Sequence, residues 1–352
     1  MRVAVVCADR GVPWLGRGGA SSHLRGIAHG YASCGADVEV WVRTLSPRHG
    51  APTLPPPGVR ALEGPGERFG AWVGSQGRRF APDLVHERHA LDGGVGDVGA
   101  RWLLEVNAPL VWEEALFRGG RMHRRRLGRE RAQLAAPPEV IAVSGALARW
   151  IARPGVRVVP NGVSSLPPRA VAPLPLPPSA PFVLGFEGTF KAWHGLLGEI
   201  EGLRAVPTGG RRLEVQLAGE GPERERVLAA LRGAGVEAVW LGALTEGELR
   251  LARGGWSAAW MPAAPWPPPG AQALESLAGE TVPERWFAPL KEAEAAAAGL
   301  PLWKGGALVP SPPSPRTWQQ ISRGLLEPTS DLGRSPSVSW AGPSWDSGAL
   351  RS

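Results

Sequence analysis

Short apolar runs alternate with longer amphipathic stretches along this chain, and that pattern is typical of parallel sheets covered by helices. In the first half, residues 3–7 and 38–42 read as buried strands, with a helix predicted between them from about residue 21 to residue 33. Further short strands are predicted at residues 84–86, 103–106, 140–143 and 156–159. These elements predict one doubly wound domain over residues 1–165.

A proline-rich stretch separates this half from a second one. Seven of residues 166–181 are proline, a composition that favours a semi-rigid linker. A second pattern of strands and helices occupies residues 182–305. Its strands are predicted at residues 182–186, 213–217, 238–241 and 258–261, and its helices at residues 224–234 and 289–298. The predicted fold class is therefore α/β, with two domains.

The pattern fails beyond about residue 305. A cluster of prolines at residues 310–315 breaks the chain, and the segment that follows is rich in Ser, Gly and Trp without helical or strand periodicity. We expect residues 306–352 to be a poorly ordered tail.

The 352 residues carry a formal net charge of +7, and only three of the 39 basic residues are lysine. This arginine bias, beside abundant Ala, Gly and Pro, is more typical of coding composition than of a nucleic-acid surface. The basic balance still favours anionic partners such as nucleotide sugars or acidic lipid. The Arg-rich residues 121–131 read as a solvated helix face, with attraction to lipid head groups as the alternative. No nucleic-acid partner is expected, because aromatic residues do not alternate with the arginines.

Cys7 and Cys34 provide neither a disulfide framework nor a zinc-binding spacing, and we interpret both as small buried residues in a reducing cytosol. The N-terminal apolar run is too short for a signal peptide, and no run of about 18 apolar residues predicts a spanning helix. The expected location is the cytoplasm, with any membrane contact peripheral at the inner face.

The helix predicted at residues 289–298 places a cation and a carboxylate on one face. Pro289 suits the first helical position, and Gly299 ends the helix. Lys291 and Glu294 are three residues apart, so both lie near the N-terminus on the same side. Free backbone N–H groups and the helix dipole make that end a seat for phosphate, although a solvated Ala-rich helix has the same pattern.

Two other loops follow predicted strands, where ligands of α/β proteins bind. The loop after residue 186 carries Thr189, Lys191 and His194, and its two cationic side chains suggest an anion site. Gly221 lies in the loop after residue 217, where a tight turn is the simpler explanation.

Near the N-terminus, Gly18 and Gly19 precede the first predicted helix and allow close approach of backbone to a ligand, although an ordinary turn has the same residues. Neither a G-x-G-x-x-G fingerprint nor a Walker A motif is present. Glu105 and Asn107 lie at the end of a predicted strand, and Glu113 and Glu114 come shortly after. Paired carboxylates could act as acid or base, with a solvated helix start as the alternative.

Taken in order along residues 1–303, these segments resemble family 4 glycosyltransferases, which have the GT-B fold. The matching segments are Gly-Gly-Ala-Ser-Ser-His at residues 18–23, Pro-Asp-Leu-Val-His-Glu-Arg at 82–88, Leu-Glu-Val-Asn-Ala-Pro at 104–109, Ala-Val-Ser at 142–144, Pro-Asn-Gly-Val at 160–163, Gly-Thr-Phe-Lys-Ala-Trp-His-Gly at 188–195 and Pro-Leu-Lys…Glu…Ala-Gly-Leu-Pro at 289–301. Each is short, but their shared order implies two facing Rossmann-like domains with parallel sheets.

The resemblance implies a retaining transfer of a sugar from a nucleoside-diphosphate sugar to a sugar, lipid-linked or small-molecule acceptor. Lys191 and Lys291 would neutralise the leaving diphosphate, and Glu294 would bind the ribose; these three are the predicted catalytic residues. Donor-binding roles fall on Gly18, Gly19, Thr189, His194, Gly221 and Leu290, and acceptor-side roles on His23, Glu105, Asn107 and Glu113. Since no Asp-x-Asp motif is present, we expect no bound metal ion and no cofactor besides the donor.

Three departures from the family pattern suggest alternatives. Trp286 stands where many relatives carry a glutamate, and Ala288 replaces a serine that would cap the helix. The tail resembles a truncated or frame-altered C-terminus. A catalytically impaired sugar-nucleotide-binding remnant and a sugar-nucleotide epimerase are therefore the alternative hypotheses.

Overall fold

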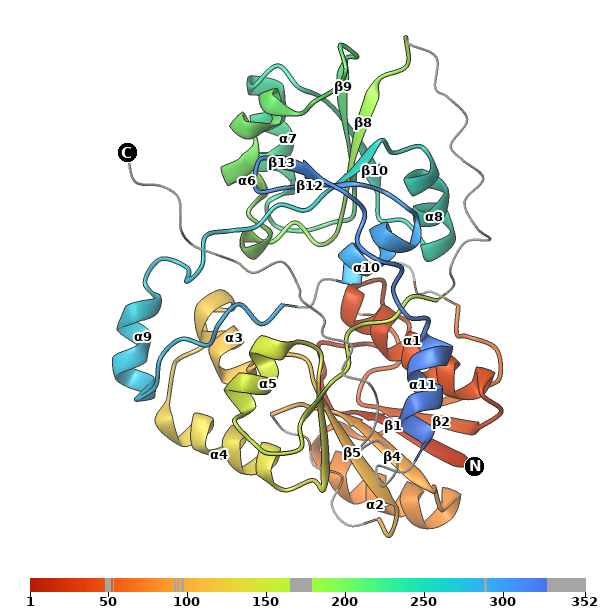
Figure 1. Cartoon of the computed structure of the whole chain (residues 1–352). Coiled ribbons are helices and arrows are strands. Elements are labelled where there is room, and N and C mark those ends of the chain that lie inside the picture. Colours follow the sequence, from red (N-terminus) through yellow and green to blue (C-terminus); the bar gives the residue numbers. More distant parts are fainter. Residues whose placement is uncertain are drawn as a thin grey trace.

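The computed structural model describes residues 1–47, 52, 54–91, 93, 95, 98–164, 179–287 and 290–327. It has two lobes, each built around a largely parallel sheet with helices packed against it (Figure 1). The α/β class predicted from the apolar pattern is confirmed by this arrangement. Most of the predicted linker at residues 166–181 lies outside the described residues, so its boundaries stay a prediction.

The N-terminal lobe holds a parallel sheet in the order β3-β2-β1-β4-β5-β6-β7. Its strands are β1 (Arg2–Cys7), β2 (Asp37–Val42), β3 (Val59–Glu63), β4 (Leu84–Arg88), β5 (Arg101–Val106), β6 (Glu139–Ala142) and β7 (Arg157–Val158). Strand β1 pairs with both β2 and β4, so the strand order reverses beside it. In doubly wound sheets, ligands bind at the carboxyl ends of the strands next to such a reversal.

The sheet of the C-terminal lobe has the order β10-β9-β8-β11-β12-β13. Its strands are β8 (Phe182–Glu187), β9 (Leu213–Ala218), β10 (Glu237–Gly242), β11 (Ala258–Trp260), β12 (Leu302–Lys304) and β13 (Ala307–Val309). Only the pairing of β12 with β13 is antiparallel among the described strands. The buried strand β8 lies near the middle, and its carboxyl end leads directly into the loop that carries Lys191 and His194.

Helices follow most of the strands, as the alternation of patterns predicts. The helices of the N-terminal lobe are α1 (Gly19–Ser33), α2 (Phe69–Phe80), α3 (Leu110–Phe117), α4 (Arg124–Ala135) and α5 (Gly145–Ile151). The later helices are α6 (Leu196–Glu199), α7 (Arg224–Gly233), α8 (Glu246–Gly254), α9 (Ala271–Ala278), α10 (Leu290–Ala297) and α11 (Trp318–Leu326).

The expectation that residues 306–352 form a poorly ordered tail is wrong for residues 306–327. Strand β13 completes the second sheet, and α11 returns to pack along α1 of the N-terminal lobe (Figure 1). Trp318, Ile321 and Leu325 recur at helical spacing and are buried in the N-terminal core. The breaker prolines obscured this short amphipathic helix. Residues 328–352 lie outside the described residues.

Glycines of α1 make room for α11. A Cβ atom at Gly26 would lie 2.2 Å from the Trp318 indole, and one at Gly30 would lie 2.4 Å from the Ser322 hydroxyl. Since real Cβ atoms do not approach other atoms this closely, both positions require glycine for the two helices to meet.

A segment of the second predicted domain also packs on the first lobe. This crossing segment, residues 264–287, leaves β11, forms α9 and reaches α10. Glu280 accepts hydrogen bonds from the indoles of Trp112 and Trp150 at 2.8 and 3.2 Å. Trp286 is fully buried in the same cluster, so the position where many relatives carry a glutamate is here a core position of the N-terminal lobe.

A buried carboxyl group caps helix α3 and predicts a pH-dependent stability. Glu130 of α4 accepts hydrogen bonds from the backbone N–H groups of Leu110 and Val111 at 2.6 and 3.2 Å. Burial raises the pKa of Glu130 to about 7. Because its folded-state pKa exceeds the unfolded one, this group stabilises the protein below about pH 4.5 and loses that contribution as the pH rises through 7.

Glu130→Gln is therefore expected to flatten the fall in stability between pH 5 and pH 8, a term of roughly 3 kcal/mol in the wild type. Urea unfolding at several pH values measures it. Glu114→Gln is the control, because the Glu114 side chain is 33% exposed and should leave the slope as it is. Equal slopes in Glu130→Gln and the wild type would contradict the assignment.

Within the described part of the chain, no helix has both the length and the apolar character that crossing a bilayer requires.

Candidate functional site

The carboxyl ends of the two sheets meet at the junction between the lobes. Arg17, in the loop after β1, donates a 2.6 Å hydrogen bond to the carbonyl of Ala243, in the loop after β10. Helix α10 lies at this junction (Figure 1), and its first residue, Leu290, packs against the core of the N-terminal lobe. The side chain of Leu290 therefore anchors the helix, and its predicted donor-binding role stays a prediction.

Lys291 lies at the centre of the C-terminal side of this junction. Its Nζ atom lies 2.9 Å from Nδ1 of His194 and 4.6 Å from the centroid of the Phe186 ring. A Cβ atom at Gly188 would come within 3.5 Å of the same Nζ, at a φ of +149° that other residues rarely adopt. Strand β8, the loop after it and helix α10 thus bring the ammonium group of Lys291 close to Gly188 at the end of the strand.

The protonation states of this pair follow from its contacts. Burial, together with the charges of Lys291 and Lys191, lowers the pKa of His194 to about 2, so its ring is neutral. An ammonium group only donates hydrogen bonds, so Nδ1 of His194 accepts and Nε2 carries the proton. Burial also lowers the pKa of Lys291 to about 8. His194 is thus a neutral donor, and the prediction that it is one of two cationic side chains in this loop is wrong.

Thr189 and Lys191 flank this pair in the same loop. The Thr189 hydroxyl lies 3.4 Å from Nε2 of His194. The Nζ atom of Lys191 lies 4.5 Å from the centroid of the Trp193 ring, and burial and then the charge of Arg118 lower its pKa. Trp193 in turn meets Phe117 of α3 with 5.2 Å between ring centroids. The loop therefore touches the opposite lobe beside its lysine.

Glu294 is held by an arginine that no local sequence pattern identified. Arg253 of α8 donates to both oxygens of Glu187 at 2.7 Å and to Glu294 at 2.6 Å. Burial, and then the neighbouring Glu187 carboxyl, raise the pKa of Glu294 well above its ordinary value. The carboxyl group predicted to bind ribose thus lies one helical turn beyond Lys291, as its spacing implied, but inside a buried network.

The glycines predicted to bind the donor differ in what the protein itself demands of them. A Cβ atom at Gly18 or Gly19 would meet no atom within 4 Å, so free space adjoins the start of α1. At Gly221 a Cβ atom would lie 2.4 Å from the backbone nitrogen of Phe190. Packing therefore requires glycine at position 221, because it lets the loop after β9 lie against the loop after β8, which carries Lys191.

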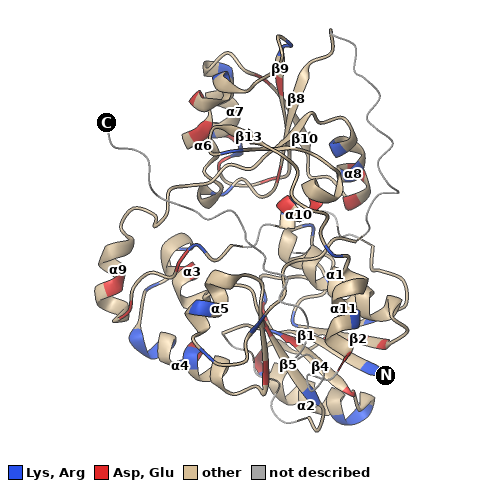
Figure 2. Ribbon diagram, viewed as in Figure 1, with Lys and Arg blue, Asp and Glu red and all other residues tan. Residues whose placement is uncertain are grey.

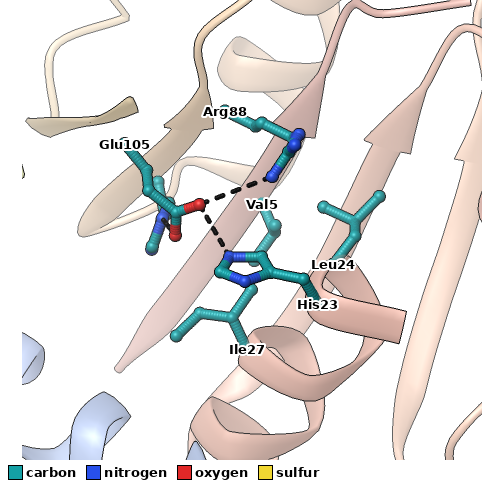
Figure 3. Close-up of a pocket in the computed structure, with 7 residues that line it drawn as sticks. Val5, His23, Leu24, Ile27, Arg88 and Glu105 are labelled. Atoms are coloured by element: carbon teal, nitrogen blue, oxygen red, sulfur yellow. Dashed lines mark hydrogen bonds and ion pairs between the residues drawn. The ribbon is translucent and has the colours of Figure 1, made fainter. Parts of the chain in front are cut away.

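On the N-terminal side, Glu105 is the centre of a buried polar cluster (Figure 3). His23 of α1 lies 2.6 Å from one carboxylate oxygen, and His86 of β4 lies 3.0 Å from the other. Asn107 donates to Glu105 at 2.5 Å. Burial would raise the pKa of Glu105, but the two histidines outweigh it and hold that pKa well below its ordinary value. Three predicted acceptor-side residues are thus brought together.

Strand pairing explains this cluster. Cys7, Arg88 and Glu105 stand in register at the carboxyl ends of β1, β4 and β5. Side chains two residues apart on a strand share a face, so His86 and Arg88 both point toward α1. No local pattern in the sequence indicated a role for either residue. The alternation of side chains along β4 places both residues on one face of the sheet. This indicates a shared site only once β5, which carries Glu105, is known to be the neighbouring strand.

The outer members of the cluster connect it to α11. Nδ1 of His23 lies 2.8 Å from the Asn161 side-chain oxygen, and the Tyr31 hydroxyl lies 2.8 Å from Nδ1 of His86. The edge of the His23 ring meets the Trp318 ring at 4.7 Å between centroids. The C-terminal helix thus supports a residue of the predicted acceptor side.

Glu113, the fourth predicted acceptor-side residue, lies apart from this cluster. It stands on α3 and pairs with Arg118. Its charge acts on Lys191, so it faces the C-terminal side of the junction. Among the described residues, no three or more His, Cys, Asp or Glu side chains are grouped so that they could hold a metal ion.

The basic residues of α4 lie at the outer edge of the N-terminal lobe (Figure 2). Arg126 pairs with Glu114, and Arg131 pairs with Glu280. Arg124, Arg125 and Arg129 are exposed. A solvated face and a face for anionic lipid both fit this arrangement, so peripheral membrane contact stays a proposal.

Comparison by sequence matches the N-terminal lobe, and comparison by structure matches both lobes. The sequence model of Glycosyltransferase Family 4 matches residues 17–165. The N-terminal lobe is therefore similar to the family 4 glycosyltransferase domain, the family that the ordered motifs resemble. No curated protein matches the sequence.

Solved structures show the fold of both lobes. Sucrose-phosphate synthase from Thermosynechococcus elongatus matches with a TM-score of 0.60 and 17% identity, over 86% of this chain and 81% of that one. The lipopolysaccharide glycosyltransferase WaaG matches with a TM-score of 0.57 and 16% identity, over 92% and 89%. HepE from Anabaena matches with a TM-score of 0.53 and 16% identity, over 94% and 90%. The predicted GT-B architecture is confirmed.

Proposed function

We propose that this protein transfers a sugar, with retention of configuration, from a nucleoside-diphosphate sugar to an acceptor. The observation that carries the proposal is Lys291, a buried cation beside a glycine at the end of the central strand of the second lobe. Glu187 and Glu292 act on Lys291 through their charge, but no carboxylate of the described residues is hydrogen-bonded to it. A buried cation in that position is costly unless a ligand compensates it. A diphosphate at this position would do so. The HepE structure, which shares this fold, is described as a complex with UDP and glucose.

The residues of the lysine site then act on the leaving group. In the transfer, the bond from the anomeric carbon to the diphosphate oxygen breaks, and a bond to the acceptor oxygen forms on the same face of the sugar. The proton of the acceptor hydroxyl passes to the departing diphosphate. Negative charge develops on the diphosphate, and fixed donors that point at it lower the barrier. Lys291 supplies charge, His194 supplies its Nε2–H, and Lys191 supplies a second charge.

The remaining residues would bind the two substrates. Glu294, oriented by Arg253, would accept hydrogen bonds from the ribose. Gly18 and Gly19 leave space at the start of α1 for close backbone approach. On the other lobe, His23 and Asn107 line the acceptor side around Glu105.

The proposal predicts nucleoside diphosphate binding without a divalent ion, because lysine side chains provide the positive charge. Isothermal titration with UDP, GDP, ADP and TDP in excess EDTA measures this. One base class is expected to bind in the micromolar range, with the same affinity after magnesium is added. Failure of all four to bind, or binding that requires magnesium, would overturn the proposal.

One reason for the alternative hypothesis, a catalytically impaired sugar-nucleotide-binding remnant, no longer holds. It rested on C-terminal elements that were expected to be missing, whereas β13 and α11 are present and packed. Transfer and epimerisation are separated by incubating the donor alone, since only an epimerase changes the donor sugar without an acceptor.

A further inference from the structure

Arg88 occupies the position where a doubly wound lobe binds its ligand. It is the last residue of β4, directly beside β1, where the strand order reverses. Its neighbour across the sheet is Glu105 at the end of β5. The loop after β1, which reaches the opposite lobe through Arg17, begins next to it.

The hydrogen-bonding capacity of Glu105 is largely filled by other residues. His23, His86 and Asn107 all lie within 3.0 Å of its two oxygens. The closest approach of Arg88 to Glu105 is 3.6 Å, which is too long for a hydrogen bond. Arg88 therefore contributes charge near Glu105 but is not the group that satisfies it.

One end of the Arg88 guanidinium lies in the ion pair with Glu105 but has no hydrogen bond to any described residue. Its Nη1 atom is buried and makes no hydrogen bond within the part of the chain that the structure describes. Buried donors are almost always hydrogen-bonded, and a charged donor that is not needs an explanation such as an absent ligand. Figure 3 shows this guanidinium pointing into the pocket beside Glu105 and His23.

Among the ionisable side chains of the cluster, that of Arg88 is the most exposed. Its side chain is 14% exposed, against 7% for His23, 4% for Glu105 and 2% for His86. A ligand arriving from the junction between the lobes would therefore meet the arginine first, with the histidines and the carboxylate behind it.

We propose that Arg88 binds an oxyanion, a phosphate ester or a carboxylate, carried by the acceptor. The guanidinium suits this task because its N–H groups match two oxygens of such a group at once. The buried cluster behind it holds Arg88 at the strand end. This inference rests on the proposed function, because it assigns the N-terminal side of the junction to the acceptor.

The test uses the intact chain saturated with its best nucleoside diphosphate, so that the lysine site is filled. Glucose 6-phosphate and glucuronate are the probes, glucose is the uncharged control, and inorganic phosphate tests the free ion. Binding is measured by titration calorimetry in wild type, Arg88→Gln and Arg88→Lys. Arg79→Gln is the matched control, since Arg79 pairs with Glu39 away from the junction, and Glu39 keeps a hydrogen bond from Trp41.

At least one anionic sugar is expected to bind the wild type at least tenfold more tightly than glucose and more tightly than inorganic phosphate. Arg88→Gln should abolish this preference, Arg88→Lys should keep part of it, and Arg79→Gln should keep all of it. Equal binding of charged and uncharged sugars by the wild type would overturn the proposal, whether or not Arg88→Gln folds. An unchanged preference in Arg88→Gln would also overturn it, and so would tighter binding of inorganic phosphate than of both sugars. If the wild type binds no nucleoside diphosphate, the proposed function itself is refuted.

Discussion

Lys291→Ala is expected to weaken nucleoside diphosphate binding about 10- to 150-fold, the loss that corresponds to one hydrogen bond to a charged group, about 1.5–3 kcal/mol. The lysine is buried, and its Nζ lies beside His194 and Gly188 at the end of β8. Its removal would also free Nδ1 of His194 and leave the proton position of that ring unspecified. Titration calorimetry with the preferred nucleotide measures the change.

Lys304→Ala is the matched control for this prediction. Lys304 belongs to the same lobe and pairs with Glu292 at 2.6 Å, on the strand after α10. Since it lies outside the His194 site, its loss should change nucleotide affinity by less than about twofold. Similar losses in both variants would show that the effect is general electrostatics and not a specific contact of Lys291.

The pH dependence of binding gives a second measure of the same lysine. With its pKa lowered to about 8, Lys291 is charged at pH 7 and largely neutral at pH 9. Nucleotide affinity of the wild type should therefore fall as the pH rises through 8. In Lys291→Ala the affinity should be low throughout and nearly flat over this range, because the titrating group is gone.

Trp318→Ala is expected to destabilise the protein by about 3–5 kcal/mol, the usual cost of deleting a buried aromatic side chain. Trp318 is 4% exposed, and its indole fills the space that Gly26 and Gly162 leave open. The cavity cannot close by a small shift, since glycines have no side chain to move into it. Urea unfolding measures the loss.

Trp240→Ala is the control for that substitution. The Trp240 side chain is 40% exposed and stacks under Arg224, so its removal should cost about 1 kcal/mol. A loss for Trp318→Ala no larger than for Trp240→Ala would show that α11 is not a structural part of the N-terminal lobe.

Much of the fold was predictable because its strands are short apolar runs bounded by turns. The strand predicted at residues 182–186 is β8, and the helix predicted at residues 224–234 is α7 within one residue. The crossing segment, residues 264–287, and α11 were missed. Their apolar faces are covered by α1 and by α3 to α5, more than 100 residues earlier, and neighbouring prolines interrupt the local periodicity.

Part of the candidate site was likewise predictable from the sequence, and part was not. The spacing of Lys291 and Glu294 and the position of His194 after a strand were visible in the sequence, because helix and strand geometry fix which side such residues share. Arg253 and Arg88 were not identified as site residues. Each lies on an element of its own, and nothing local to it indicates which carboxyl group it will meet.

The sequence by itself determined the alternation of strands and helices, the order of the short motifs, and a cation near the start of one helix. Only the tertiary structure decided that His194 is neutral and hydrogen-bonded to Lys291, and that Arg253 donates a hydrogen bond to Glu294. It also decided that two histidines contact Glu105. The reason is physical: parallel pairing brings strand ends from distant parts of the chain into one row, and burial then sets the charge that each group carries.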